Sequence, residues 1–409
     1  MKKSTVSIFS VPVFVAALGY FVDIYDLLLY TIVRVPSLRS LGLNDARIRD
    51  DGLRIINMQM IGLLIGGIIW GMLGDKKGRL SVLFGSIFLY SAANFANGFV
   101  QTVDQYAWAR FIAGLGLAGE LGAGITLISE ILPKEKRGVG TSLVAGIGLS
   151  GAVLAYFISQ QFDWRTCYFI GGGLGIALLL LRISVAESGM FKHLKEQKIS
   201  RGDFSQFFTN GPRFKKYLLS ILIGLPTWYV IGILVSFSRE FGKAFGIKEE
   251  IDPGRAIMFA YVGISIGDIL VGLLSQVLQS RKKALFVFYG LTIISVAVYF
   301  TQTGGSASGM YAICTALGFS TGFWAIFVTM GAEQFGTNLR ATAATTIPNM
   351  VRGSLPLIAL LFKDLLQVNL GYTIIVSGMI TGAIVIAITL VAAWFTEETF
   401  TKDLDYLEL

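Results

Sequence analysis

Long apolar stretches of about 20 residues recur along the chain and exclude most soluble folds. A helix needs about 20 apolar residues to cross a bilayer, and in lipid the backbone must satisfy its own hydrogen bonds, which favours helices. Apolar residues make up 54% of the sequence and charged residues 15%, whereas soluble domains carry about 25% charged residues. We therefore predict an all-α polytopic membrane protein with twelve transmembrane helices. The predicted spans are residues 10–33, 55–74, 80–100, 105–129, 138–160, 165–183, 216–238, 256–279, 284–302, 307–331, 341–366 and 372–395.

The longest polar stretch separates the sixth span from the seventh. It runs from Glu187 to Lys216, and its cations are Lys192, Lys195, Lys198, Arg201, Arg213, Lys215 and Lys216. We interpret it as a cytoplasmic linker between two halves of six helices each. The expected divisions are a first half at 1–186, the linker at 187–215, a second half at 216–398 and a short cytoplasmic tail at 399–409.

Lysine and arginine concentrate in alternate loops, as the positive-inside rule describes for membrane proteins. The basic loops fall on one side if the N-terminus is cytoplasmic; they are 75–79, 134–137, the linker, 281–283 and the turn at Arg340. The loop after the first span departs from this pattern. It carries Arg39, Arg47, Arg49 and Arg54, partly offset by Asp45, Asp50 and Asp51. The distribution favours two cytoplasmic termini in a plasma membrane, such as the bacterial inner membrane.

The sequence lacks the residues that several other classes of function need. Cys167 and Cys314 lie in apolar runs and are expected to be small core residues, and the lone His193 lies in the basic linker. We therefore expect no metal site and no cofactor. The net charge of +8 comes from the cytoplasmic loops, so it does not indicate nucleic-acid binding. The sequence contains no G-x-x-x-x-G-K-[ST] motif, so we do not expect ATP to drive the protein.

A short charged turn at 71–79 joins the second and third spans. Its sequence, Gly-Met-Leu-Gly-Asp-Lys-Lys-Gly-Arg, resembles the G-x-x-x-D-[RK]-x-G-R-[RK] loop of the major facilitator superfamily. The fourth span and the loop after it read R-F-x-x-G-x-x-x-x-G-E and then E-x-x-P-x-x-x-R-G, which resembles the sugar-porter and metabolite:proton symporter branches. The resemblance covers nearly the whole chain. It implies two pseudo-symmetric halves and transport by alternating access.

The resemblance also implies charged gating residues at the cytoplasmic ends of the helices. In the first half these are Asp75, Arg79, Glu130 and Arg137. The repeated loop at 272–283 keeps a glycine and a basic cluster but has Gln276 in place of the aspartate. Glu333 and Arg340 resemble the E-x-[FY]-P-x-x-x-R signature at the end of the tenth span, with Gly336 where proline is common, and we interpret them as a gating ion pair.

Three carboxylates lie within the predicted spans of the first half. Asp23 and Asp26 are three residues apart and so share one helix face. Glu120 lies ten residues before Glu130, roughly 15 Å deeper in the membrane. An acid at that depth is costly unless it faces a cavity or a partner. We predict that Asp23, Asp26 and Glu120 carry protons. For Asp23 and Asp26 the alternative is a structural ion pair or a hydrogen-bonded protonated acid, and for Glu120 it is a permanent pair with an arginine, with Arg110 expected nearby.

Arg352 lies roughly 18 Å deeper than Arg340 and, being always charged, needs an anion. Asp268, Glu120 or the substrate could supply it, and the prolines at 348 and 356 predict a kinked or broken helix nearby. The predicted substrate-binding residues are Arg352, Tyr25, Tyr30, Asp268, Trp228, Tyr229, Trp324 and Asn349. For the aromatic residues, a place in the core or against lipid is the alternative. The glycines of G-x-G-x-x-G at 114–119 are expected to allow close helix contact, because an apolar span does not provide a nucleotide site.

The leading hypothesis is a secondary active transporter for proton-coupled symport of a small organic anion or zwitterion, functional as a monomer in the lipid bilayer. Protons are the expected coupling ion, and the sequence leaves sodium open. A neutral sugar is the first alternative substrate, although Ala186-Glu187-Ser188 lacks the prolines and arginine of the P-E-S-P-R element of sugar porters. The sequence also leaves open proton-antiport efflux of a cationic compound and a membrane sensor that does not transport. An enzyme is not expected, because no histidine-containing triad or metal cluster is present.

Overall fold

The computed structural model describes residues 10–77, 79–120, 144–187, 204–367, 373–400 and 402. These residues form helices and connecting turns, with no strand among them. The first group of helices is α1 (Val11–Ser40), α2 (Asp45–Lys77), α3 (Arg79–Phe99), α4 (Val103–Leu117), α7 (Gly151–Gln161) and α8 (Trp164–Glu187). The second group is η2 (Phe204–Phe207), α9 (Gly211–Leu222), α10 (Leu225–Tyr229), η3 (Val230–Val235), α11 (Ser238–Ala244), α12 (Pro253–Val277), α13 (Arg281–Phe300), α14 (Ala307–Ser320), α15 (Trp324–Glu333), α16 (Thr337–Gly353), α17 (Leu355–Gln367) and α18 (Ile374–Phe395).

Ten helical runs in the described part of the chain are long and apolar enough to cross a membrane. They correspond to ten of the twelve predicted spans. For the fourth, α4 is described only as far as Leu117, with a turn and Glu120 beyond it. The eleventh span is divided into α16 and α17 at Ser354, close to the break that the prolines predicted. The seventh span is also subdivided, because α10 passes into the π-helical segment η3.

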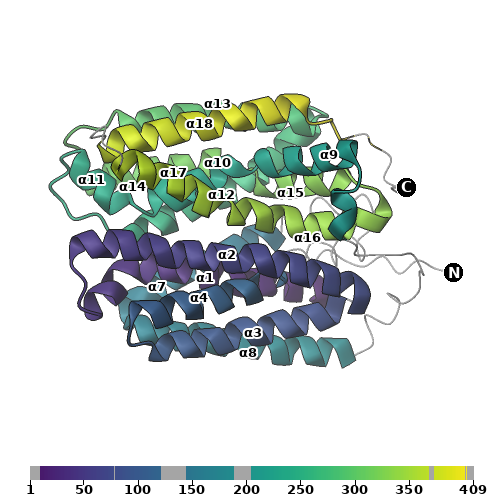
Figure 1. The fold of residues 1–409 in the computed structure, drawn as a ribbon, viewed down its shortest axis with the longest axis horizontal. Helices are drawn as coiled ribbons and strands as arrows, with labels where there is room; N and C mark the ends of the chain where they lie inside the picture. The colour runs from purple at the N-terminus through teal and green to yellow at the C-terminus, as the bar shows by residue number, and fades with distance from the viewer. Residues whose placement is uncertain are drawn as a thin grey trace.

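The helices form two layers, α1 to α8 in one and α9 to α18 in the other (Figure 1). The layers meet where α2 packs against α16 and α17, and where α1 and α7 pack against α12. Within the first layer, a Cβ at Gly114 would collide with the backbone carbonyl of Gln59, and one at Gly116 would lie 2.6 Å from the amide nitrogen of Tyr90. The predicted role of these glycines in close helix contact is confirmed.

The two ends of the bundle differ in what they contain. Helix α1 begins and α18 ends at one end, which we call the proximal end; the turn between α1 and α2 lies at the opposite end with α11, the distal end (Figure 1). Asp75 falls in the last turn of α2 and Arg79 begins α3. The side chains of these two residues, like Glu130 and Arg137, lie outside the part of the chain that the structure describes.

Glu333, which we predicted to pair with Arg340, has Arg281 as its partner in the structure. Glu333, at the end of α15, accepts hydrogen bonds of 2.7 Å from Nε and Nη2 of Arg281 at the start of α13. Arg340 donates to the carbonyl oxygen of Phe335 instead. The resemblance to the family signature implied a pair with Arg340, but the start of α13 packs beside the end of α15 and brings Arg281 to Glu333.

Candidate functional site

Asp26 is buried and tightly paired with an arginine. The Nη1 atom of Arg110, in α4, donates to Asp26 Oδ1 at 3.0 Å, and Nη2 donates to the Asp26 carbonyl oxygen at 2.9 Å. The same guanidinium also donates to Gln59 and Asn94, each at 3.2 Å. Both charged side chains have 0% exposure. This is the structural ion pair that the sequence left open as the alternative for Asp26, and it joins α1 to α4.

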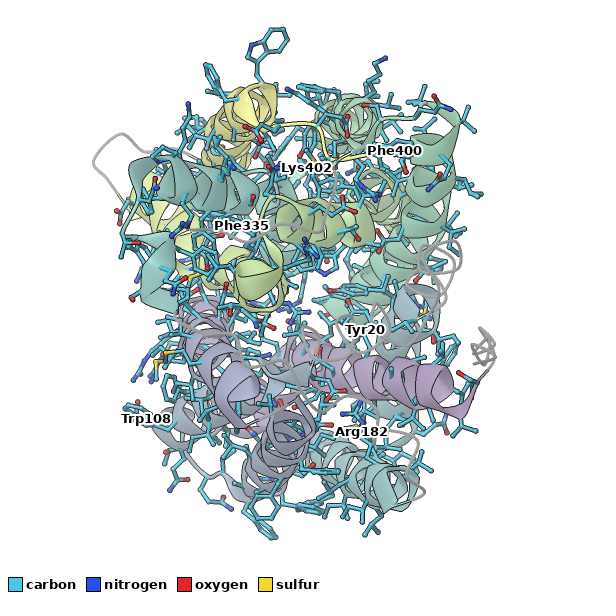
Figure 2. All side chains as sticks on the ribbon, turned by 90° about the vertical axis from the view of Figure 1, so that its right-hand side faces the viewer. Tyr20, Trp108, Arg182, Phe335, Phe400 and Lys402 are labelled. Atoms are coloured by element: carbon cyan, nitrogen blue, oxygen red, sulfur yellow. The ribbon has the colours of Figure 1, made fainter. Side chains whose placement is uncertain are left out.

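Glu120 is also held by an arginine, but not by Arg110. Arg182, from α8, donates from both of its terminal nitrogens to the two oxygens of Glu120, a bidentate arrangement that is among the strongest polar contacts in proteins. Gly19 of α1 faces this pair, and a Cβ at that position would collide with both side chains. Figure 2 shows Arg182 inside the layer of α1 to α8.

Asp23 differs from the other two acids because its charge is poorly matched. Its side chain is fully buried, yet neither Oδ1 nor Oδ2 accepts a hydrogen bond. The nearest cation is Arg352 of α16, whose Nη2 lies 3.9 Å from Asp23 Oδ2, too far for a hydrogen bond. The pair spans the boundary between the two layers.

Arg352 is 1% exposed, and its Nε and Nη1 atoms have no hydrogen-bond partner. Its guanidinium carbon lies 5.7 Å from the centre of the Trp324 ring, a cation–π contact. Tyr20 and Tyr261 lie within electrostatic range of it, and Figure 2 shows Tyr20 near the boundary between the layers. The indole nitrogen of Trp324 is buried and unpartnered too. The centre of the molecule therefore holds several buried donors without acceptors.

Asp268 does not supply the anion for Arg352, nor does Glu120. One oxygen of Asp268, in α12, accepts a hydrogen bond of 3.0 Å from the amide of Ala325 in the first turn of α15, and the other has no partner. A carboxylate at a helix N-terminus is stabilised by the free amides and the helix dipole. Asp268 therefore fixes the start of α15, beside Trp324.

The other residues predicted to bind substrate are distributed through the fold. Tyr25 donates to the carbonyl of Cys167 at 2.9 Å, Tyr30 to that of Gly52 at 3.3 Å, and Tyr229 to that of Gly378 at 2.8 Å. Asn349 donates to the carbonyl of Ala118 in the other layer at 2.8 Å. Trp228 is buried, with its indole nitrogen unpartnered. In this structure the three tyrosines and Asn349 use their donors to join helices.

Sequence reasoning overlooked Arg182, Tyr20 and Tyr261. In the sixth span, Arg182 lies between the apolar run Leu178–Leu181 and Ile183. Such an intramembrane cation is itself a signal that a carboxylate lies nearby. The two tyrosines give no comparable signal. Tyrosine is common near the ends of membrane helices, so its presence in a predicted span does not indicate a site.

Comparison with known proteins agrees with this architecture. A sequence model described as Major Facilitator Superfamily matches residues 13–360. The "Niacin transporter NiaP" of Acinetobacter baylyi is 27% identical over 367 residues, which cover 81% of each chain. The "3-(3-hydroxy-phenyl)propionate transporter" of Escherichia coli is 24% identical over 300 residues, covering 71% of this chain and 72% of that one.

Among solved structures, the crystal structure of a D-xylose-proton symporter superposes with a TM-score of 0.68 at 18% sequence identity, covering 96% of this chain and 99% of that one. At this identity the likeness is one of fold. The family match spans most of the sequence, and the helical layers have the same fold. The chain thus belongs to the Major Facilitator Superfamily, and it is a multi-pass membrane transporter rather than an enzyme.

Proposed function

We propose that this protein is a proton-coupled symporter of a small organic anion, in particular a carboxylate attached to an aromatic group, and that Arg352 binds the carboxylate. The observation that carries the proposal is the buried guanidinium of Arg352 with two unpartnered nitrogens. A planar guanidinium offers parallel N–H groups that match the two oxygens of a carboxylate. The contact with Trp324 adds an aromatic surface beside that charge.

The names of two relatives support this substrate class. Niacin and 3-(3-hydroxy-phenyl)propionate both combine an aromatic ring with a carboxylate. A neutral sugar would bring no negative charge to the buried Nε and Nη1 atoms of Arg352, whose nearest anion, Asp23, is 3.9 Å from Nη2 and forms no hydrogen bond with it. The substrate anion therefore accounts for Arg352 better than a sugar does.

Asp23 is the residue we propose for proton coupling. Of the three buried acids, it is the one whose oxygens accept no hydrogen bond in the described structure. When a substrate carboxylate occupies Arg352, Asp23 loses its counter-charge, and a buried unpaired carboxylate is stable only in its neutral form. Binding of the anion and uptake of a proton by Asp23 would then occur together. Asp26 and Glu120 remain with Arg110 and Arg182 throughout.

The charge distribution of the loops supports an orientation in the membrane, and with proton-driven symport this orientation gives the direction we propose. The basic loops favour a cytoplasmic proximal end, so we propose that substrate enters from the distal end and leaves at the proximal end. The proton gradient across a bacterial inner membrane would drive uptake in that direction.

The test is uptake of labelled nicotinate into proteoliposomes with an imposed pH gradient. We expect accumulation by the unaltered protein. Arg352→Gln should weaken nicotinate binding by about tenfold to a hundredfold, the usual effect of losing a hydrogen-bonded charge. Asp23→Asn should keep binding and exchange of nicotinate but lose accumulation driven by the gradient. Arg49→Gln, which removes an exposed cation of α2, is the matched control and should behave like the parent protein.

Four outcomes would overturn the proposal. Unchanged nicotinate affinity in Arg352→Gln would remove the anion site. Gradient-driven accumulation by Asp23→Asn would show that the proton is carried elsewhere. Nicotinate binding without flux in the parent protein would favour a sensor, and D-xylose uptake in the same vesicles would favour a sugar porter.

A further inference from the structure

One oxygen of Asp268 is a buried hydrogen-bond acceptor that no described residue uses. Asp268 lies in α12 and is 2% exposed. Its Oδ1 atom accepts from the amide of Ala325 at 3.0 Å, whereas Oδ2 has no hydrogen-bond partner in the described part of the chain. Buried polar atoms are nearly always hydrogen-bonded in folded proteins. A donor for Oδ2 therefore has to come from water or from a bound molecule.

The fold holds this carboxylate in one place. The tenth span is broken at residues 321–323, between α14 and α15. A Cβ at Gly322 would lie 2.7 Å from Cα of Gly267 and 2.9 Å from the amide nitrogen of Asp268, so α12 touches the broken segment backbone to backbone. This approach lets Oδ1 reach a free amide in the first turn of α15, where a helix has no carbonyl partners of its own. With Oδ1 fixed in this way, the position of Oδ2 is fixed as well.

Trp324 connects Asp268 with the cation at the centre of the molecule. Trp324 is the residue next to Ala325, whose amide binds Asp268, and its ring lies 5.7 Å from the guanidinium carbon of Arg352. Tyr20 of α1 is within electrostatic range of both Asp268 and Arg352. The unused acceptor and the unused donors therefore belong to the same central region, with an aromatic side chain between them.

The two charged groups require opposite chemistry from a bound molecule. The free nitrogens of Arg352 match the oxygens of a carboxylate. The ionised form of Asp268 is stabilised by the N-terminus of α15 and can only accept hydrogen bonds, so it requires a hydroxyl or a protonated nitrogen. A simple aromatic acid such as benzoate would satisfy Arg352 and leave Asp268 Oδ2 without a donor.

We propose that the transported anion carries a hydrogen-bond donor, a hydroxyl or a protonated nitrogen, on the part of the molecule away from its carboxylate, and that Asp268 Oδ2 accepts from it. This inference rests on the proposed function, because the carboxylate has to bind Arg352 for the ring to lie beside Trp324. Arg352 then selects acids as a class, and Asp268 selects among them. Nicotinate meets the requirement in its zwitterionic form, in which the ring nitrogen is protonated.

The test compares the affinities of matched aromatic acids for the purified protein by isothermal titration calorimetry. The probes are benzoate, its meta- and para-hydroxy and aminomethyl derivatives, and the corresponding methoxybenzoates. At least one hydroxy or aminomethyl derivative should bind about tenfold more tightly than benzoate or better, as expected for a hydrogen bond to a charged acceptor. A gain from the hydroxyl identifies an oxygen donor, and a gain from the aminomethyl group, which is protonated at neutral pH, identifies a nitrogen donor. The methoxybenzoates have no donor and should bind no better than benzoate.

Asp268→Asn removes the charged acceptor and keeps an oxygen for the amide of Ala325. It should reduce the preference for the donor-bearing acid over benzoate by about tenfold and leave benzoate affinity unchanged, which also shows that the variant is folded. Asp252→Asn is the matched control. It makes the same change at the start of the same helix, where Asp252 accepts from the amide of Gly254 and asparagine caps equally well, so every affinity should stay as in the parent.

The inference and the proposed function fail by different results. Equal affinities for benzoate and all donor-bearing acids would overturn the inference. So would a methoxybenzoate that binds as tightly as its hydroxy counterpart, or a preference that survives Asp268→Asn. Arg352→Gln should weaken benzoate and the donor-bearing acid by the same factor and leave their ratio unchanged. Benzoate affinity that survives Arg352→Gln would contradict the anion site of the proposed function instead.

Discussion

At the scale of single residues, the three buried acids of the first layer differ in how completely their charge is compensated. Asp26 and Glu120 each receive hydrogen bonds from an arginine of their own layer. Asp23 faces Arg352 across the layer boundary at 3.9 Å without a hydrogen bond. A compensated pair resists change, whereas a loosely matched one can exchange partners at lower cost. The difference separates structural acids from the one we propose for coupling.

Asp26→Asn should destabilise the protein far more than Asp23→Asn. Removing Asp26 leaves the buried Arg110 without its counter-charge, which typically costs about 3–5 kcal/mol. Asp23 accepts no hydrogen bond from Arg352, so replacing Asp23 should lower the stability much less. Thermal unfolding of the purified variants measures both. Replacing both members of the pair, as in Asp26→Asn with Arg110→Met, should recover part of the stability. Equal melting temperatures for the two single variants would contradict this interpretation.

At the scale of elements, the break between α16 and α17 determines where Arg352 lies. Arg352 occupies the last turn of α16, where a cation interacts favourably with the carbonyl end of the helix dipole. The break follows two residues later, with Ser354 donating to the carbonyl of Val351 at 2.6 Å and Pro356 in the first turn of α17. A proline is readily accommodated there because its missing amide is not needed. The prolines that predicted an irregular helix thus mark the turn that positions the cation.

A second element, the segment after α18, is fastened across the proximal end of the second layer. Glu398 accepts hydrogen bonds from Ser280 and from the amides of Arg281 and Lys282, so it caps the N-terminus of α13. Thr399 donates to Glu333 at 2.7 Å. Partial burial raises the pKa of Glu398, but the bonds from Ser280 and the backbone amides outweigh it and lower the pKa below the ordinary value. The repeated loop has Gln276 in place of the acid, and Glu398 brings a carboxylate to the end of that loop, at Ser280 and Arg281.

Glu398→Gln should lower the stability of the protein at neutral pH by about 1 kcal/mol, the usual loss when a helix N-terminal cap is weakened. Because the pKa is lowered in the folded state, the carboxylate contributes stability above its ordinary pKa of 4.5, and this contribution disappears as the pH falls through the lowered value. The difference in melting temperature between the parent and Glu398→Gln should therefore shrink below pH 4.5. A difference that grows on acidification would contradict the sign of the pKa shift.

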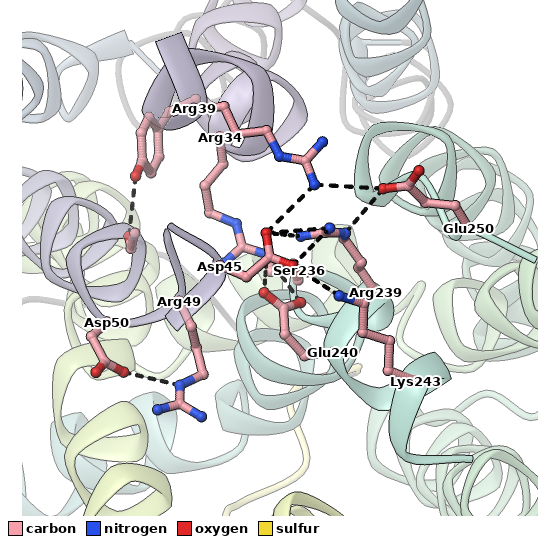
Figure 3. Close-up of polar contacts among 12 residues, drawn as sticks. Arg34, Arg39, Asp45, Arg49, Asp50, Ser236, Arg239, Glu240, Lys243 and Glu250 are labelled. Carbon is pink, nitrogen blue, oxygen red and sulfur yellow. Dashed lines mark hydrogen bonds and ion pairs between the residues drawn. The ribbon is translucent and has the colours of Figure 1, made fainter. Parts of the chain in front are cut away.

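At the scale of the whole molecule, the two layers touch at both ends. At the distal end, Arg34 pairs with Glu240, and Asp45 pairs with Arg239 and Lys243 (Figure 3). Toward the proximal end, Asn349 of α16 donates to the carbonyl of Ala118 just past α4, and Gly67 of α2 packs on the Asn349 side chain. Arg352 and Asp23 lie between these two sets of contacts along α16 and α1. Rocking of the layers about this centre would open one end while the other stays joined.

Gly67→Ala should shift the protein toward conformations with a separated proximal end. A Cβ at this position would lie 2.7 Å from the Cβ of Asn349, and overpacking of this kind costs about 1–3 kcal/mol, which separation of α2 from α16 would relieve. The reporter is Thr346→Cys, a buried position that faces Gly71 of α2, and maleimide labelling should be faster in the Gly67→Ala background. Gly173→Ala, where a Cβ meets nothing within 4 Å, should leave the rate unchanged. Equal rates in both backgrounds would show that this contact does not hold the proximal end.

The sequence by itself determined the membrane class, the position of most spans and the family, because the length of an apolar run and the motif spacings are local properties. It also identified most of the charges that lie in the membrane, since a charged residue in an apolar run is conspicuous, although it missed Arg182. Only the tertiary structure decided which partner each charge has. Glu120 meets Arg182, Glu333 meets Arg281, and Asp23 meets Arg352 while Asp26, three residues away, meets Arg110. Electrostatic pairing depends on distance in space, and helices far apart in the sequence set that distance.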